Sequence, residues 1–300
     1  MLSLHTNAAS LSSQNAVGNT QKSLTTSLTR LGTGYRVNSA MDDAAGLQIA
    51  TRLNAQTRGM AVAQRNTQNG ISMMQTAEGA FNELTNVLLR MKDLATEAFN
   101  ASSTADDKAA LQAEYDALGS EIANIIKSTS FGGSTLFSTD GTAVPAAGAA
   151  AGLLGASATG ITFQIGASAN ETMVVNVQAD LQALSTALNA VSANYAAATP
   201  GTGTELTAGT NARITQINTA INAVGKVRAQ LGASSNRLEH VYNNLGNMML
   251  NTNASRGRIM DVDYATETSN STSKQLLLQA GTSALKQSSS LSQLVMSLMQ

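Results

Sequence analysis

The chain has 300 residues, of which 43% are apolar, 12% are charged and 3% are aromatic, and it contains no cysteine. The lack of cysteine excludes disulfide bonds, a thiol nucleophile, and zinc or iron–sulfur sites built on thiolates. Eighteen basic and nineteen acidic residues give a net charge of −1, which excludes the basic footprint of a protein that binds nucleic acid or an anionic membrane.

Both ends of the chain carry leucine or alanine on a seven-residue spacing, with further leucines three or four residues away. The N-terminal set is Leu4, Leu11, Leu24, Leu28 and Leu31. The C-terminal set is Leu277, Ala284, Leu291, Leu294 and Leu298. This spacing predicts two terminal arms, residues 1–43 and 256–300, that pair as a coiled coil and pack against other copies of the chain. An ordinary amphipathic surface helix at each end is the alternative interpretation.

The arms carry few large apolar side chains for their length. Burial of so little apolar surface does not offset the entropy lost when a segment of this length becomes ordered. We therefore expect both arms to be disordered in a monomer and to fold only against partner copies.

Targeting signals are not apparent in the sequence. No basic segment followed by a long apolar run opens the chain, so we expect no cleaved signal peptide. The longest uncharged stretch, residues 141–170, is rich in Gly, Ala, Ser and Thr, which is too weakly apolar to predict a membrane-spanning helix.

A break follows the N-terminal arm, because residues 32–34 read Gly-Thr-Gly. Asn38 and Ser39 are favourable N-cap residues, and Asp42 and Asp43 place negative charge in the turn that follows. We therefore expect a long helix to begin immediately after this turn.

Apolar residues then recur with a helical period over residues 44–100, which predicts a helix roughly 80 Å long at 1.5 Å per residue. A second helix, around residues 111–126, is expected to pack back on the first, and residues 211–253 show the same period. Together these helices predict a rod domain formed by residues 44–140 and 211–255.

Residues 141–210 form a predicted insert between the two halves of the rod. Two β-type runs, residues 161–165 and 172–177, predict a hairpin, and residues 179–195 are weakly helical. Residues 256–258, Arg-Gly-Arg, predict a joint before the C-terminal arm. The predicted fold class is mainly α, with long antiparallel helical rods, terminal coiled-coil arms and a small β-hairpin insert.

The sequence offers little for catalysis. Its two histidines, His5 and His240, lie far apart along the chain, and neither is expected in a catalytic triad or a metal site. Asp261 and Asp263 are more suited to capping the C-terminal arm than to acid–base chemistry. We predict no catalytic, metal-binding or cofactor-binding site, and no enzymatic activity.

Several segments resemble, in the same order, the signature of bacterial flagellin. They are residues 34–47 (GYRVNSAMDDAAGL), 65–80, 231–245, 261–265 (DVDYA) and 279–283 (QAGTS). Because the similarity covers both the N-terminal and the C-terminal parts, the chain resembles a short flagellin that lacks large outer domains.

The resemblance implies a structural subunit that is exported unfolded through the flagellar type III channel and polymerises outside the cell into a helical filament for motility. It implies that the arms form the wall of the tube and that the rods surround it. The implied partners are other copies of the chain, an export chaperone on the C-terminal arm, and the filament cap and junction proteins. Neither nucleic acid, a membrane nor a cofactor is among them.

The resemblance also implies recognition by a host receptor. Residues 89–96 (LRMKDLAT) are similar to the site that toll-like receptor 5 reads in this family, and Arg90, Leu94 and Glu114 match the positions of contact residues. Thr96 stands where valine is usual, a departure that bears on the strength of recognition.

Three alternatives compete with this interpretation, and the sequence nearly excludes the second of them. A hook–filament junction protein resembles flagellin at both ends but forms a small ring. A flagellin with a zinc protease in its insert needs a His-Glu motif, and no histidine occurs between His5 and His240. A secreted helical protein that acts on membranes is the third.

Overall fold

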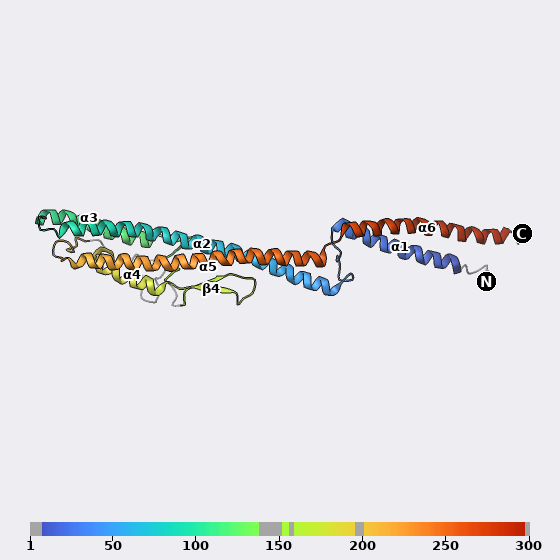
Figure 1. Cartoon of the computed structure of the whole chain (residues 1–300), viewed down its shortest axis with the longest axis horizontal. Helices are drawn as coiled ribbons and strands as arrows, with labels where there is room; N and C mark the ends of the chain where they lie inside the picture. Colours follow the sequence, from blue (N-terminus) through green and yellow to red (C-terminus); the bar gives the residue numbers. More distant parts are fainter. Residues whose placement is uncertain (1–7, 138–151, 156–158, 196–200, 298–300) are drawn as a thin grey trace. The chain divides into compact units, whose positions relative to one another are not determined.

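The structure is a computed structural model that describes residues 8–137, 152–155, 159–195 and 201–297. Helices dominate this part of the chain, and its strands form only two antiparallel two-stranded sheets (Figure 1). The elements are α1 (Ala8–Thr33), α2 (Ala44–Ala98), α3 (Ala105–Ser128), β1 (Ser130–Phe131), β2 (Ser134–Thr135), β3 (Ile161–Gln164), β4 (Thr172–Val175), α4 (Gln178–Val191), the short 3-10 helix η1 (Ala193–Tyr195), α5 (Ala212–Met260) and α6 (Tyr264–Ser297). The predicted mainly α fold class, with long antiparallel helices, is confirmed.

The chain divides into two compact units. The first contains residues 1–57 and 250–300, and the second contains residues 58–249. The predicted division into three domains, the arms, the rod and the insert, stays a prediction.

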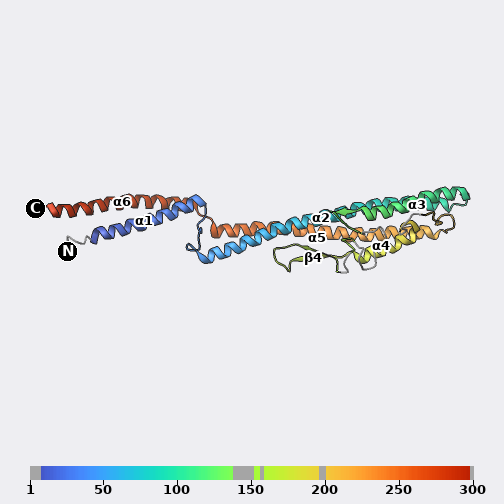
Figure 2. The same cartoon turned by 180° about the vertical axis from the view of Figure 1, so that it is seen from behind.

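In the first unit, α1 and α6 lie side by side and antiparallel (Figures 1 and 2). Their neighbouring ends are joined by a single antiparallel bridge between Tyr35 and Asp261. Gly34 supports this bridge, because its φ of 75° lies in the left-handed region and its carbonyl accepts a 3.0 Å hydrogen bond from the Val262 N–H. The segments that follow α1 and precede α6 therefore pair directly through their backbones.

The helix boundaries in this unit differ from the sequence prediction at two places. The predicted joint at residues 256–258 is wrong, because α5 continues to Met260 and the chain turns at residues 261–263. The N-cap of α2 is Asp43 rather than Asn38 or Ser39, since its Oδ1 accepts from the Gly46 N–H at 2.8 Å. An aspartate directly before the helix satisfies an otherwise unpaired N–H, and that position decides the start.

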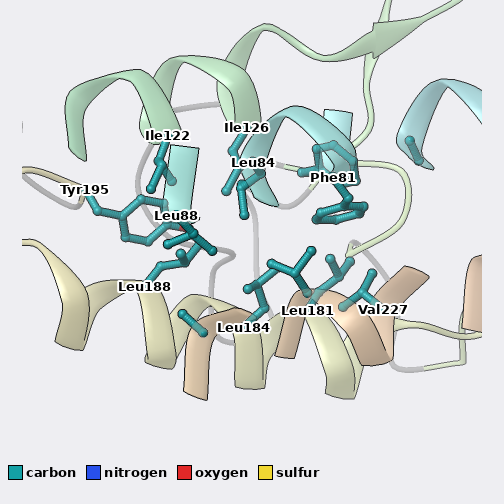
Figure 3. Packing of buried hydrophobic residues seen from close by; sticks show 14 of the residues in the cluster. Phe81, Leu84, Leu88, Ile122, Ile126, Leu181, Leu184, Leu188, Tyr195 and Val227 are labelled. Carbon is teal, nitrogen blue, oxygen red and sulfur yellow. The ribbon is translucent and has the colours of Figure 1, made fainter. Parts of the chain in front are cut away.

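In the second unit, α2, α3, α4 and α5 pack around one apolar core (Figure 3). The side chains that meet there recur at helical spacing on each element, which is the periodicity the sequence shows. They include Phe81, Leu84 and Leu88 of α2, Ile122 and Ile126 of α3, Leu181, Leu184 and Leu188 of α4, Tyr195 of η1 and Val227 of α5. The core therefore fixes three helices of the predicted rod together with one from the predicted insert.

The predicted hairpin is confirmed as β3 and β4, in a register that pairs Ile161 with Val175 and Gln164 with Thr172. A second hairpin, β1 and β2, was not predicted. Its two-residue turn consists of Gly132 and Gly133, both at positive φ, which is the backbone that such a tight turn requires.

A buried polar cluster holds the segment before α5 against α3. Glu205, only 4% exposed, accepts from Gln112 Nε2 at 2.8 Å and from the Ala193 N–H at 2.8 Å. Asp116 accepts from the same Gln112 nitrogen and from the Gly203 N–H. Both carboxylates are therefore satisfied by amide donors, as buried polar groups must be.

Candidate assembly and recognition surfaces

The contact between α1 and α6 follows a heptad on both helices, which we call the seam. Its α1 positions, spaced alternately three and four residues apart, are Ser10, Ser13, Val17, Thr20, Leu24, Ser27 and Leu31. Its α6 positions are Glu267, Ser271, Lys274, Leu278, Gly281, Leu285 and Ser288. All of them are buried or half-buried, and most are small or polar, so the seam holds unusually little apolar surface.

The leucines predicted for filament packing fall on two different faces of the arm pair. Leu24 and Leu31 are half-buried in the seam, whereas Ala284 is exposed outside it. Among the described side chains of the two helices, the exposed large apolar ones are Leu11 (60%), Leu28 (50%), Leu276 (62%), Leu277 (61%) and Tyr264 (56%). Four leucines of the pair therefore face outward, whereas Leu24 and Leu31 face the seam.

The exposure of the remaining predicted packing residues is not described by the structure. Leu291 and Leu294 belong to α6, although their side chains are outside the description, and Leu4 and Leu298 lie outside the described residues.

Charged groups surround the end of the seam next to the turn at residues 261–263. Arg30 lies 3.7 Å from Asp42 and 4.0 Å from Glu267, which is 7% exposed. The pKa of Asp42 is lowered, chiefly because the Ser39 N–H and hydroxyl donate to its carboxylate. Arg30 thus holds α6 and the turn before α2 to the same end of α1.

Asp263 caps α6, in agreement with the capping role predicted for the two C-terminal aspartates. Its carboxylate accepts from the Thr266 hydroxyl at 2.6 Å and from the Ala265 N–H at 3.1 Å, and these hydrogen bonds lower its pKa. Asp261 instead takes part in the bridge to Tyr35 through its backbone.

Two of the three predicted receptor-contacting residues meet on the surface of the second unit. Arg90 of α2 donates through Nε to Glu114 Oε1 of α3 at 2.7 Å, and both side chains are about half exposed. Leu94 is 1% exposed and belongs to the apolar core. The structure therefore brings Arg90 and Glu114 together on the surface and leaves Leu94 buried.

Sites for chemistry are not found in the part of the chain that the structure describes. His240 is exposed on α5, and His5 lies outside the described residues. Across the described ranges, no three histidine, cysteine or acidic side chains gather as they would around a metal ion. Among the described helices, none is both long and apolar enough to cross a membrane.

The fold is that of a mainly α protein whose long helices pack antiparallel, with two small two-stranded sheets. Residues 4–142 match the family model of the bacterial flagellin N-terminal helical region, and residues 214–299 match that of the C-terminal helical region. The chain belongs to the bacterial flagellin family and is a structural subunit of the flagellar filament. Members of this family are structural and non-enzymatic.

Two flagellins of Vibrio species agree with this assignment. Flagellin A of Vibrio anguillarum is 34% identical over 377 aligned residues, with all of both chains covered. Flagellin B of Vibrio cholerae serotype O1 is 34% identical over 361 residues, which cover 95% of this chain and 96% of the relative. The crystal structure of Bacillus cereus flagellin is 30% identical, covers 60% of this chain and 88% of its own, and superimposes with a TM-score of 0.45. The family assignment favours a filament subunit over the junction protein considered from the sequence.

Proposed function

We propose that this flagellin is exported unfolded through the flagellar type III channel and polymerises outside the cell into a tubular helical filament. In this proposal the arms, residues 1–43 and 256–300, form the wall of the tube. The rod, residues 44–140 and 211–255, forms the layer around it, and residues 141–210 form a small insert in that layer.

The observation that carries the proposal is the outward position of the arm leucines. Four of them, Leu11, Leu28, Leu276 and Leu277, are 50–62% exposed although the seam between α1 and α6 is largely polar. Full burial of one leucine side chain contributes roughly 1.5–3 kcal/mol, so a monomer that leaves these side chains in water forgoes most of this stabilisation. Contact with neighbouring copies recovers it.

The test is seeded filament growth followed by electron microscopy. Leu277→Asp places a charge on the outward face of α6 and is expected to abolish growth while leaving the second unit folded, because a charge is costly to bury unpaired. Leu277→Met keeps the volume and apolar character and is the matched control. Normal filaments from the aspartate variant contradict the assignment of this face.

The same arms also suit the proposed export and assembly partners. An export chaperone that covers the outward leucines of α6 keeps the unpolymerised chain from associating early, and the filament cap and junction proteins contact the same chain ends after export. If α6 is the chaperone site, the Leu277→Asp variant binds the chaperone more weakly in a pull-down from bacteria.

We further propose that Arg90 and Glu114 form a surface that host toll-like receptor 5 reads. Their ion pair is exposed, so both groups are available to a partner, and their charges are presented at a fixed distance by α2 and α3. Leu94 acts indirectly, through the packing of the core that holds α2, because its side chain is buried.

A further inference from the structure

The apolar contacts of the seam do not define a unique alignment of α6 on α1. Val17 lies opposite Gly281, since a Cβ atom on Gly281 would be 2.8 Å from Val17 Cγ2. Counting from this pair along the two antiparallel helices, Leu278 comes opposite Thr20 and Leu285 opposite Ser13.

A slip of one heptad changes these layers very little. It moves α6 about 10 Å along α1, at 1.5 Å per residue. Leu278 then faces Ser27 and Leu285 faces Thr20, so each leucine still faces a small hydroxylated residue. Leucine packing therefore discriminates poorly between the two alignments.

A slip would break the polar contacts of Lys274, as it would the ion pair of Glu267 with Arg30. The Lys274 ammonium group donates to Ser27 Oγ at 2.7 Å and approaches the Ser23 carbonyl at 3.4 Å. Ser27 is 0% exposed, so water cannot replace the lysine at that hydroxyl. After a slip of one heptad the ammonium group reaches Gly34 in one direction and Thr20 in the other, and in both cases the buried Ser27 hydroxyl loses its lysine partner.

We propose that Lys274, through Ser27, is the positioning residue that fixes the register of α6 on α1 in the filament. A single polar or charged residue at a seam position can select one register of a coiled coil at some cost in stability. The register matters for assembly because it sets where Leu276 and Leu277 lie relative to Leu11 and Leu28 on the outward face. This inference rests on the proposed polymerisation through the arms.

Disulfide trapping in assembled filaments tests the register directly, because the chain has no cysteine of its own. The pair Val17→Cys with Gly281→Cys reports the observed register. The pairs Val17→Cys with Ser288→Cys, and Ser10→Cys with Gly281→Cys, report a slip of one heptad in either direction. Cysteines about 10 Å apart along the helices cannot be bridged, so each pair reports one alignment only.

In the parent background, we expect the observed-register pair to link and both slipped pairs to stay reduced. With Lys274→Met added, the ratio of slipped to observed-register linkage should rise about tenfold, the effect of losing one charge-assisted hydrogen bond. Lys274→Arg should restore the parent pattern. Lys286→Met, which removes an exposed lysine from the same helix, should leave the pattern unchanged.

The variants are incorporated at low fraction into filaments of unmodified chain, so that a variant unable to grow alone is still measured. Ser27→Ala removes the acceptor from the other helix and should shift linkage in the same direction. Unchanged linkage in both Lys274→Met and Ser27→Ala overturns the proposal and leaves the backbone bridge at Tyr35 as the feature that sets the register. Failure of the unmodified chain to form filaments instead contradicts the proposed function.

Discussion

Gly59 of α2 lies directly against Ala167 in the loop between β3 and β4, because a Cβ atom on Gly59 would come within 2.6 Å of the Ala167 Cβ. Gly70, three turns further along α2, meets the ring of Phe163 in the same way, at 3.0 Å. The hairpin thus docks on the helix where two glycines leave room for it. A glycine inside a helix is otherwise destabilising. At these two positions the close packing of the hairpin offsets that loss of helix stability.

Gly59→Ala and Gly79→Ala are therefore expected to change stability in opposite directions. The first forces the Ala167 backbone to move and should lower the free energy of unfolding by about 1 kcal/mol, despite the gain in helix propensity. The second meets nothing within 4 Å and should raise it by up to about 1 kcal/mol. Urea denaturation followed by circular dichroism compares them, and equal effects would show that the hairpin does not constrain α2.

Leu84 and Leu89 provide a second matched pair on α2. Leu84 is 0% exposed at the centre of the core, so Leu84→Ala should cost about 2–5 kcal/mol through lost burial and a cavity. Leu89 is 46% exposed, and Leu89→Ala should change stability by no more than about 0.5 kcal/mol. A small effect at Leu84 would contradict the packing shown in Figure 3.

The N-terminus of α3 should carry a measurable pH dependence. The pKa of Asp107 lies below its ordinary value of 3.8, first because the Thr104 hydroxyl donates to its carboxylate and second because the Thr104 N–H does. Since the pKa in the folded state is the lower one, this contribution to stability is present above about pH 4 and is lost as the pH falls through the folded pKa. Asp107→Asn should reduce the loss of stability between pH 5 and pH 2. The neighbouring Asp106→Asn, which leaves the capping box intact, should reduce it less.

The arms should be flexible before assembly. The seam is mostly small or polar, so α1 and α6 gain little from pairing alone, and ordering them costs conformational entropy. Backbone NMR of a dilute monomer should therefore give low order parameters for residues 8–34 and 265–297, and rigid values for the helices of the second unit. Rigid arms in the monomer would refute this expectation.

Arg90→Ala should separate recognition from stability. An exposed ion pair contributes roughly 0–1 kcal/mol, so the variant should unfold at nearly the temperature of the parent. Activation of cells that express toll-like receptor 5 should fall severalfold. Arg228→Ala, which breaks the exposed pair with Glu78, is the matched control and should leave activation unchanged. Equal activation by both variants would remove Arg90 from the proposed receptor surface.

The sequence alone determined the helices, the β3–β4 hairpin, the capping role of Asp263 and the family. Helical periodicity, turn residues and cap residues are local signals, because each can be recognised within a short window of sequence. The heptad of α6 was ambiguous, because Leu277 and Ala284 repeat with the same spacing as Leu278 and Leu285. Adjacent helix positions point about 100° apart, so a sparse pattern of leucines fits either face.

Only the tertiary structure decided between these faces. Packing against α1 turns Leu278 inward and Leu277 outward, and it brings Lys274 to Ser27 across 247 positions of sequence. The burial of Leu94 has the same origin, since the orientation of α2 is fixed by the side chains of α3, α4 and α5. Local sequence specifies that a helix forms, whereas the face it buries depends on which partner removes most apolar surface from water.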